Sequence, residues 1–336
     1  MQAATFYGPR DFRIESVPDP VPGPEEAVVR VHSAGICGGD LHEYRAGVQL
    51  YGAPYPRPAQ GHEIAGTVVA VGAVGAERIG VGDRVAVQPM ISCGVCDECL
   101  AGRRALCVRL EHIGVARSGG FAELCLAPAE NLYILPAEVG DEEGALLDCT
   151  AVAVHALARV PVSPGSTVTV LGAGAVGLAV AQLARLSGGA VTLVATRRKP
   201  LEIALELGID DLVDLGTGEH PPTDADVVFE TAGGPTMLER ALAAAGLGAT
   251  IGLVGEAFDA QRLEPASVLP RELTLAFVWS HDGRAEYERA LELAAQGDVR
   301  LSPAVTHRYP LSELDEAFVA AADKDRSGAI KVIVTP

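Results

Sequence analysis

The apolar positions divide the chain into two stretches with different periods. Up to about residue 130, short apolar runs are separated by Gly and Pro, as in "EEAVVRVHSAG", "EIAGTVVAVG", "DRVAVQP" and "FAELCLAP". Short strands with this punctuation predict an antiparallel, barrel-like region. From about residue 150, helical patterns such as "GAVGLAVAQLARL" and "PLEIALELG" alternate with strand patterns such as "STVTVLG" and "AVTLVA". This alternation predicts an α/β region with a parallel, doubly wound sheet and helices on both faces.

The C-terminal part of the chain is mixed. Helices are predicted over 284–296 and 311–322, and the strand "GAIKVIVTP" ends the chain. We find no internal repeat and no low-complexity linker. The boundary near 149 is therefore a change of pattern rather than a flexible hinge.

Composition narrows the possible partners. A chain of 336 residues is long enough for two domains, and its 44 acidic against 26 basic residues give a net charge of −18. This charge disfavours binding to nucleic acid or to anionic membrane surfaces. The start, "MQAATFYGPRDF", has no basic segment followed by an apolar run, and no stretch approaches ~18–20 apolar residues. We expect a cytoplasmic protein that binds neither nucleic acid nor membranes.

The segment "TVLGAGAVG" leads a predicted strand directly into a predicted helix. It places Gly172, Gly174 and Gly177 at G-x-G-x-x-G spacing, with Ala175 and Val176 opening the helix. In dinucleotide-binding sites these glycines permit a tight turn, close approach of the pyrophosphate and close helix–strand packing. These five residues are predicted to bind the cofactor. The alternative is a glycine-rich turn with a structural role.

The next strand ends in a basic cluster. In NAD sites an Asp or Glu at this place accepts hydrogen bonds from the ribose hydroxyls. This chain has Ala195 and Thr196 there, followed by Arg197, Arg198 and Lys199. Guanidinium groups bind phosphate oxygens well, so the cluster predicts a site for the 2′-phosphate of NADP(H). The alternative is a solvated first turn of the following helix.

Four cysteines lie close together in "CGVCDECLAGRRALC". The spacing of Cys93, Cys96, Cys99 and Cys107 allows four thiolates to surround one tetrahedral zinc ion. Four protein ligands leave no position for a substrate, so this site is predicted to be structural. The alternative is that the thiols are simply buried or oxidised.

A second set of metal-ligand residues is dispersed. "GICGGDLHEY" supplies Cys37, and "GHEIAG" supplies His62, which are suitable zinc ligands. Asp40 can orient the histidine, and Glu63 can act beside the metal or as a ligand. Asp148 in "LLDCTAVAVHA" is a candidate for the third ligand, which would leave one position open for catalysis. Without further information, a small buried cysteine and surface acids explain these residues equally well.

Several ordered motifs resemble the zinc-dependent medium-chain alcohol and polyol dehydrogenases, in particular the sorbitol, threonine and butanediol dehydrogenase branch. They are "GICGGDLHEY", "GHEIAGTVVAVG", "VGDRVAV", the four-cysteine lobe, "GGFAEL", "LLDCTAVAVHAL", "VLGAGAVGLAVAQLA" and "GAIKVIV". The resemblance implies that Cys37, His62 and Asp148 bind catalytic zinc, with Glu63 adjacent. Asp148 precedes His155 by seven residues, as the ligand Glu of the polyol branch precedes its His, while the alcohol branch favours Cys149.

The resemblance also implies the domain plan. A GroES-like barrel domain is expected from residues 1–149 and 281–336, with the structural-zinc lobe at about 90–110, around a Rossmann domain of 150–280. "ATRR" is similar to the strand end of NADP-dependent secondary alcohol dehydrogenases. Arg326 is a further residue that we predict to bind the cofactor. Members form homodimers or homotetramers through the strand near 273–279.

One position departs from the family pattern. The family usually has Ser or Thr two residues after the first Cys ligand, and its hydroxyl passes the alcohol proton outward. This chain has Gly39 there, while His42, which resembles the outer relay histidine, is retained. We expect ordered water, or a second hydroxyl of the substrate, to carry the proton to His42.

Together these features predict a zinc-dependent dehydrogenase that interconverts an alcohol with a ketone or aldehyde, prefers NADP(H) and holds two zinc ions per chain. One alternative is an NADPH-dependent carbonyl or enone reductase with a vestigial catalytic zinc. Another is a non-catalytic nucleotide-binding redox sensor. Tyr51, Leu106 and Trp279 are candidates for the substrate pocket, and equally for the core or a dimer contact.

Overall fold

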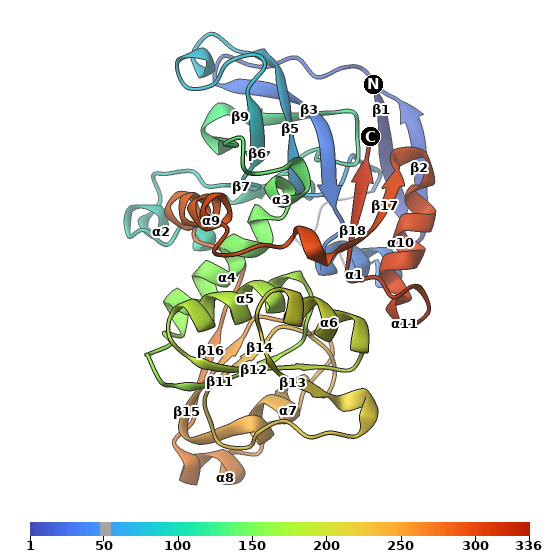
Figure 1. Cartoon of the computed structure of the whole chain (residues 1–336). Coiled ribbons are helices and arrows are strands. Elements are labelled where there is room, and N and C mark those ends of the chain that lie inside the picture. The colour runs from blue at the N-terminus through green and yellow to red at the C-terminus, as the bar shows by residue number, and fades with distance from the viewer. Residues whose placement is uncertain (48–54) are drawn as a thin grey trace. The chain divides into compact units, whose positions relative to one another are not determined.

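The computed structural model describes residues 1–47 and 55–336, and the chain divides into two compact units (Figure 1). The first unit contains Met1–Asp148, Asp282–Ala295 and Val305–Pro336, and the second contains Cys149–His281 and Gln296–Ala304. The short segment Gln296–Ala304 therefore groups with the second unit, although the expected division assigned it to the first.

The first unit is built on a seven-stranded sheet in the order β10-β6-β5-β3-β18-β17, with β9 also paired to β3. The two long strands, β3 and β5, are buried along more than half of their length. Side chains from this sheet and from α10 form one core that includes Ile64, Phe121 and Phe318. The strands are β3 (Glu26–Gly35), β5 (Glu63–Val71), β6 (Arg84–Val87), β9 (Leu124–Pro128), β10 (Leu132–Ile134), β17 (Val305–Pro310) and β18 (Lys331–Thr335).

Smaller elements complete this unit. Two further sheets have the orders β2-β1-β4 and β7-β8. Their strands are β1 (Gln2–Gly8), β2 (Asp11–Ser16), β4 (Arg57–Pro58), β7 (Met90–Ile91) and β8 (Glu111–His112). The helices are α1 (Gly38–Ala46), α2 (Asp97–Leu100), α3 (Asp141–Ala145), α9 (Arg284–Gln296), α10 (Leu314–Ala322) and α11 (Lys324–Ser327), and α4 (Leu147–Arg159) begins at the boundary between the units.

The second unit is a six-stranded parallel sheet in the order β13-β12-β11-β14-β15-β16. Helices α5 and α6 cover one face and α7 covers the other, so the expected doubly wound α/β arrangement is confirmed (Figure 1). The strands are β11 (Thr167–Leu171), β12 (Ala190–Ala195), β13 (Asp211–Asp214), β14 (Ala225–Glu230), β15 (Ala245–Leu253) and β16 (Thr274–Phe277). The helices are α5 (Ala175–Leu186), α6 (Arg198–Glu206), α7 (Met237–Ala244) and α8 (Pro265–Val268).

The antiparallel pairing of β3 and β5 positions the dispersed metal-ligand residues. The register pairs Gly35, at the end of β3, with Glu63, at the start of β5. Cys37 follows the first strand and His62 precedes the second, so both residues lie at the same edge of the sheet. Sheet pairing thus brings together two motifs that are separated by 24 intervening residues in the sequence.

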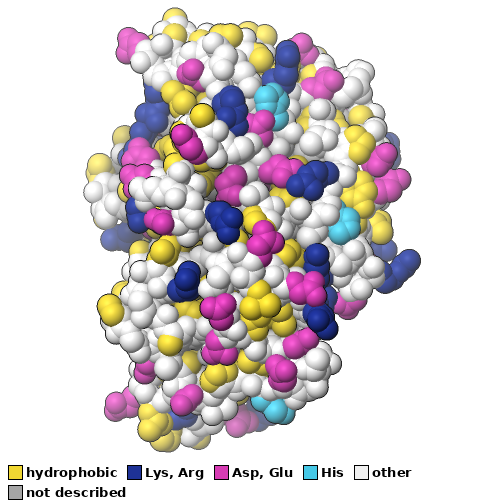
Figure 2. All heavy atoms as spheres, in the orientation of Figure 1, with side chains coloured by type: hydrophobic (Ala, Val, Ile, Leu, Met, Phe, Trp, Pro, Cys, Tyr) yellow, Lys and Arg dark blue, Asp and Glu magenta, His cyan; other side chains and the backbone are white. Residues whose placement is uncertain are grey.

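The surface carries mixed charge. On the face shown in Figure 2, acidic and basic side chains are interspersed, so neither sign of charge forms a large patch on that face. Among the helices that the structure describes, none combines the length and the apolar composition needed to cross a bilayer.

Candidate metal and cofactor sites

Helix α1 fixes the first ligand candidate. Cys37 is the N-cap residue, with extended backbone angles, and Asp40 lies three positions into the helix. The Asp40 carboxylate accepts a hydrogen bond of 2.8 Å from the Cys37 backbone N–H. This capping interaction satisfies one of the donors that a helix start leaves open and fixes the direction of the Cys37 side chain.

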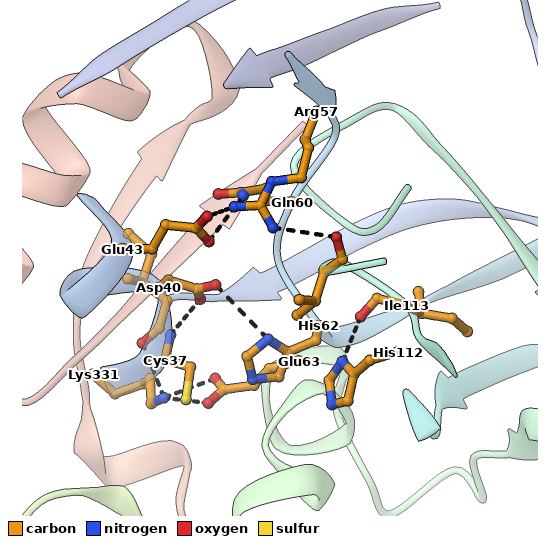
Figure 3. A network of polar contacts seen from close by, with 12 residues as sticks. Cys37, Asp40, Glu43, Arg57, Gln60, His62, Glu63, His112, Ile113 and Lys331 are labelled. Carbon is orange, nitrogen blue, oxygen red and sulfur yellow. Dashed lines mark hydrogen bonds and ion pairs between the residues drawn. The ribbon is translucent and has the colours of Figure 1, made fainter. Parts of the chain in front are cut away.

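Three ligand groups converge at the sheet edge (Figure 3). One ligand atom from each of Cys37, His62 and Glu63 lies within 4.8 Å of the others. Glu63 is fully buried, and the His62 side chain is only 11% exposed. Thiolate, imidazole and carboxylate are all zinc ligands, so this donor set fits a zinc ion.

The charges around His62 also favour a cation. Burial by itself would lower the pKa of His62, but the neighbouring Cys37 and Asp40 outweigh burial and raise that pKa well above its usual range. Asp148 acts in the same direction. Burial raises the pKa of Asp40, whose Oδ1 lies 3.8 Å from His62 Nδ1. A divalent ion compensates this concentration of negative charge more completely than a single proton does.

Lys331 reaches the same cluster from β18 (Figure 3). Its Nζ donates to both carboxylate oxygens of Glu63, at 2.6 and 2.7 Å, and to the Ile36 carbonyl oxygen at 3.1 Å. Both charged side chains are buried, which is rare for Lys and Glu unless they are paired. The sequence analysis missed this residue, although a lysine inside the apolar strand "AIKVIV" was the available sign.

The remaining candidates for the catalytic centre lie on helices α1 and α4. Asp148 is buried in the first turn of α4, near enough to influence His62, but it is not one of the three residues in the tight cluster. Cys149 is buried and belongs to the second unit. His42 is half-buried on α1, and Gly39 is buried on the same helix.

A second polar layer lies beyond Asp40 (Figure 3). Glu43 on α1 accepts a hydrogen bond from Gln60 at 3.1 Å and forms an ion pair with Arg57. All three side chains are buried. These contacts attach the segment that precedes His62 to the helix that follows Cys37. Sequence reasoning missed this layer too; the available sign was Arg57 and Gln60 within the "YPRPAQGHE" segment.

The four-cysteine lobe forms a second cluster. The Sγ atoms of Cys93, Cys96, Cys99 and Cys107 lie within 4.8 Å of one another, and all four cysteines are free. The Cys93 and Cys99 sulfurs are 3.9 Å apart, as are those of Cys96 and Cys107. Four thiols at this spacing fit a tetrahedral zinc ion and leave no ligand position for a substrate.

The surroundings of the lobe affect its cysteines differently. A hydrogen bond from the Val95 backbone lowers the pKa of Cys93 to about 5, whereas burial raises that of Cys99 to about 11. Backbone N–H groups of Cys93 and Arg109 donate to Cys107 Sγ, at 3.3 and 3.4 Å. Backbone donors of this kind stabilise the negative charge that zinc-bound sulfurs retain.

The glycine-rich loop joins β11 to α5 in the second unit. Gly172 has φ +111, which favours glycine, and Gly174 is the N-cap of α5. A Cβ at Gly177 would lie 1.9 Å from the Gly172 carbonyl oxygen, so helix and strand pack too closely for any side chain there. A Cβ at Gly174 would meet nothing within 4 Å, and Ala175 and Val176 begin the helix. The loop therefore fits a pyrophosphate at the helix N-terminus.

The basic cluster follows the next strand. Ala195 is the buried last residue of β12, Thr196 is exposed, and Arg197 is the N-cap of α6. The Arg198 side chain is 85% exposed and pairs with Glu202 at 3.1 Å. Asp214, at the end of the adjacent strand β13, is paired in register with Ala195, and its carboxylate accepts a hydrogen bond from Gly216 N–H.

Other predicted site residues are more scattered. Arg326 lies on α11 in the first unit with its side chain 88% exposed, 3.6 Å from Asp323. Leu106 is 56% exposed in the cysteine lobe, and Trp279 is 36% exposed after β16. Tyr51 lies outside the described residues.

Two family models match the chain. Residues 23–137 match an alcohol dehydrogenase GroES-like domain, and residues 175–296 match a zinc-binding dehydrogenase. The chain is 31% identical over 353 residues to a sorbitol dehydrogenase of Bacillus subtilis, covering 100% of this chain and 97% of the relative.

Solved structures show the same fold. A zinc-binding dehydrogenase from Sinorhizobium meliloti bound to NADP superposes with a TM-score of 0.90 at 30% identity, covering 100% of this chain and 99% of that one. An Escherichia coli alcohol dehydrogenase complexed with NADH has a TM-score of 0.86 at 27% identity, with the same coverage.

Proposed function

Because the chain belongs to the zinc-containing medium-chain alcohol dehydrogenase family, we propose that it oxidises a secondary alcohol or polyol, or reduces the corresponding carbonyl, with NADP(H) as the preferred cofactor. The convergence of Cys37, His62 and Glu63 within 4.8 Å is the observation that carries this proposal. A thiol, an imidazole and a carboxylate buried this close together favour a working metal site over a vestigial one.

Each group of the site has a role in this proposal. Cys37 and His62 hold the ion, and Asp148 is the proposed third ligand. Asp40, which lies 3.8 Å from His62 Nδ1, orients the imidazole. Zinc, when bound, supplies a Lewis acid that lowers the pKa of a hydroxyl and polarises a carbonyl. The four cysteines of the lobe hold a second, structural zinc.

The alcohol proton leaves through water in this proposal. Gly39 has no hydroxyl, and the space of a missing hydroxymethyl group in a polar site suits one water molecule. His42, half-buried on the same helix, receives the proton and passes it to solvent. The extra space also favours bulky or polyhydroxylated substrates over ethanol-sized ones.

The proposed cofactor preference rests on charge and space. Ala195 leaves room at the strand end, Thr196 supplies a hydroxyl, and Arg197 and Arg198 supply cations for a 2′-phosphate. Of the two solved relatives described above, one is bound to NADP and the other to NADH. Similarity to relatives therefore does not choose between the two cofactors, and the proposed preference is argued from the residues of this chain alone.

Assembly and location complete the proposal. β16 is an edge strand of the six-stranded sheet, and Phe277 on it is 75% exposed. An apolar edge strand of this kind is suited to pairing with a second copy, which supports a homodimer or homotetramer. The proposed location is the cytoplasm.

A turnover panel of alcohols and ketones, run with NADP(H) and NAD(H) and combined with metal analysis, tests the proposal. We expect two zinc ions per chain and turnover of secondary alcohols or polyols. One zinc per chain, with reduction of carbonyls or enones only, would favour the vestigial-zinc reductase. NADPH binding without turnover of any substrate would favour the redox sensor.

A further inference from the structure

The position of Glu63 raises the question of what this carboxylate does beside the metal site. Its ligand atom is close enough to Cys37 and His62 to share an ion with them. The same carboxylate is bound through both oxygens by Lys331, at 2.6 and 2.7 Å. A metal ion and an ammonium group therefore compete for one buried carboxylate.

The surroundings hold Glu63 toward Lys331. The Glu63 carboxylate lies against the backbone of β3, because a Cβ at Gly35 would come within 1.9 Å of its Oε2. Only a residue without a side chain leaves this space. On the other side, Lys331 is anchored by the Ile36 carbonyl oxygen at 3.1 Å, next to Cys37. Three segments, the end of β3, the start of β5 and the start of β18, thus meet at one buried ion pair (Figure 3).

We propose that Lys331 is a positioning residue that keeps Glu63 out of the metal's ligand shell. This inference rests on the metal site of the proposed function. The buried ammonium compensates the charge of Glu63, and a compensated carboxylate attracts a divalent ion less strongly than a free one does. The ligand set is then Cys37 and His62 with a third group from elsewhere, and one position stays open for the substrate oxygen.

The consequence is that a substitution at Lys331 changes the coordination of a metal it does not touch. Without the ammonium, Glu63 is a buried, uncompensated carboxylate within reach of the ion. It would then be available as an additional ligand, at the position that the proposed ligand set would otherwise leave open. Lys331 therefore decides between an open, catalytic site and a closed one.

Cobalt spectroscopy tests this proposal without using turnover. The protein is prepared with Co²⁺ at the proposed catalytic site and zinc in the four-cysteine lobe, as checked by metal analysis, and visible absorption then reports the number and type of cobalt ligands. We expect Glu63→Gln to keep the wild-type cobalt spectrum. Lys331→Met is expected to change the spectrum to that of a site with one more oxygen ligand and to tighten metal binding by at least ~10-fold.

The double variant and a matched control complete the design. Glu63→Gln/Lys331→Met is expected to return to the wild-type spectrum, because the competing carboxylate is gone. Lys324→Met makes the same change at a half-buried lysine on α11, outside the proposed metal and cofactor sites, and is expected to leave the spectrum unchanged. A changed spectrum in Glu63→Gln alone overturns the proposal, since Glu63 would already be a ligand. An unchanged spectrum in folded Lys331→Met also overturns it.

Two further results would distinguish failure of this inference from failure of the proposed metal site. If Lys331→Met does not fold, Lys331→Gln, which keeps a hydrogen-bond donor beside Glu63 but removes the charge, takes its place: a spectrum with one more oxygen ligand supports the proposal, and the wild-type spectrum overturns it. If His62→Ala still binds cobalt with the wild-type spectrum, the metal site of the proposed function is itself contradicted, and this inference falls with it.

Discussion

The two cysteine-containing clusters of the first unit are built in opposite ways. The structural lobe takes Cys93, Cys96, Cys99 and Cys107 from 15 consecutive residues. The catalytic cluster takes Cys37, His62 and Glu63 from the ends of two paired strands, and Lys331 from the end of the chain. All residues of the first cluster come from one short segment, whereas the residues of the second come together only when the sheet forms.

This difference separates stability from chemistry. A closed set of four thiolates can bind a metal as a local segment, so its binding free energy contributes to folding. In the dispersed cluster, a histidine is buried among negatively charged groups, which lowers the stability of the fold when no metal is bound. We expect a bound metal to compensate these charges. Loss of metal should therefore have different effects at the two sites.

The largest expected effect is on turnover at the dispersed site. His62→Ala removes a proposed zinc ligand, and we expect turnover to fall by more than ~100-fold, since loss of a group in the outer shell already costs 10–100-fold. The melting temperature should stay near that of the wild type, and zinc should fall from two ions to one per chain.

A neighbouring histidine provides the control. His112 lies with its ring centroid 5.1 Å from that of His62, and its Nδ1 is hydrogen-bonded to the Ile113 carbonyl oxygen at 2.9 Å. His112→Gln should keep both zinc ions. Wild-type turnover in His62→Ala would show that the dispersed cluster is not the catalytic metal site.

The next effect is on stability at the contiguous site. Cys96→Ser should lower the melting temperature by at least ~5 °C, because a structural zinc contributes folding energy and each kcal/mol shifts a domain of this size by about 2–4 °C. Calorimetry and zinc analysis measure both changes. Cys125→Ala, at a buried cysteine outside both clusters, should keep two zinc ions. A Cys96→Ser protein with normal zinc content and melting temperature would contradict a structural role.

The two zinc ions should leave the protein one after the other when metal is removed. During dialysis against a chelator, we expect the first zinc to leave with loss of turnover and little change in melting temperature. The second should leave with loss of stability, because it comes from a closed thiolate site. Simultaneous loss of activity and stability with the first ion would mean that the two sites are not independent.

The proposed 2′-phosphate site resembles the four-cysteine lobe in that its residues, 195–199, are adjacent in the sequence. Arg197→Ala should weaken NADP(H) binding by about 10-fold, because a charge-assisted hydrogen bond contributes ~1.5–3 kcal/mol, and NAD(H) binding should change little. Fluorescence titration with both cofactors measures this. Equal kcat/KM for NADP and NAD in the wild type, or unchanged NADP affinity in the variant, would contradict the proposed preference.

The smallest expected effect is at Gly39. Gly39→Ser fills the proposed water space, so turnover of the native substrate should be similar or lower, while small alcohols should improve. The substrate panel measures the ratio between the two classes. A rise of several orders of magnitude for every alcohol would mean that the proton relay is missing in the natural protein.

Much of this protein was predictable from local sequence. The strand–glycine–helix segment at 167–186 and the four-cysteine lobe each contain their complete pattern, because the interacting groups are near neighbours in the chain. The alternation of helices and strands after residue 150 likewise identified the doubly wound sheet, since each element must bury its own apolar face.

Tertiary structure alone decided the rest. Sequence placed Cys37, Asp40, His62 and Glu63 as candidates, but only the pairing of Gly35 with Glu63 brings them to one edge. Lys331 is separated from Glu63 by 268 residues, and nothing near it in the sequence indicates a carboxylate partner. Local sequence patterns predict the secondary structure of a segment and which face of that helix or strand is apolar. A buried charge finds its partner only when strands from distant parts of the chain pair, and for that reason the sheet, rather than any single motif, determines the environment of the catalytic metal.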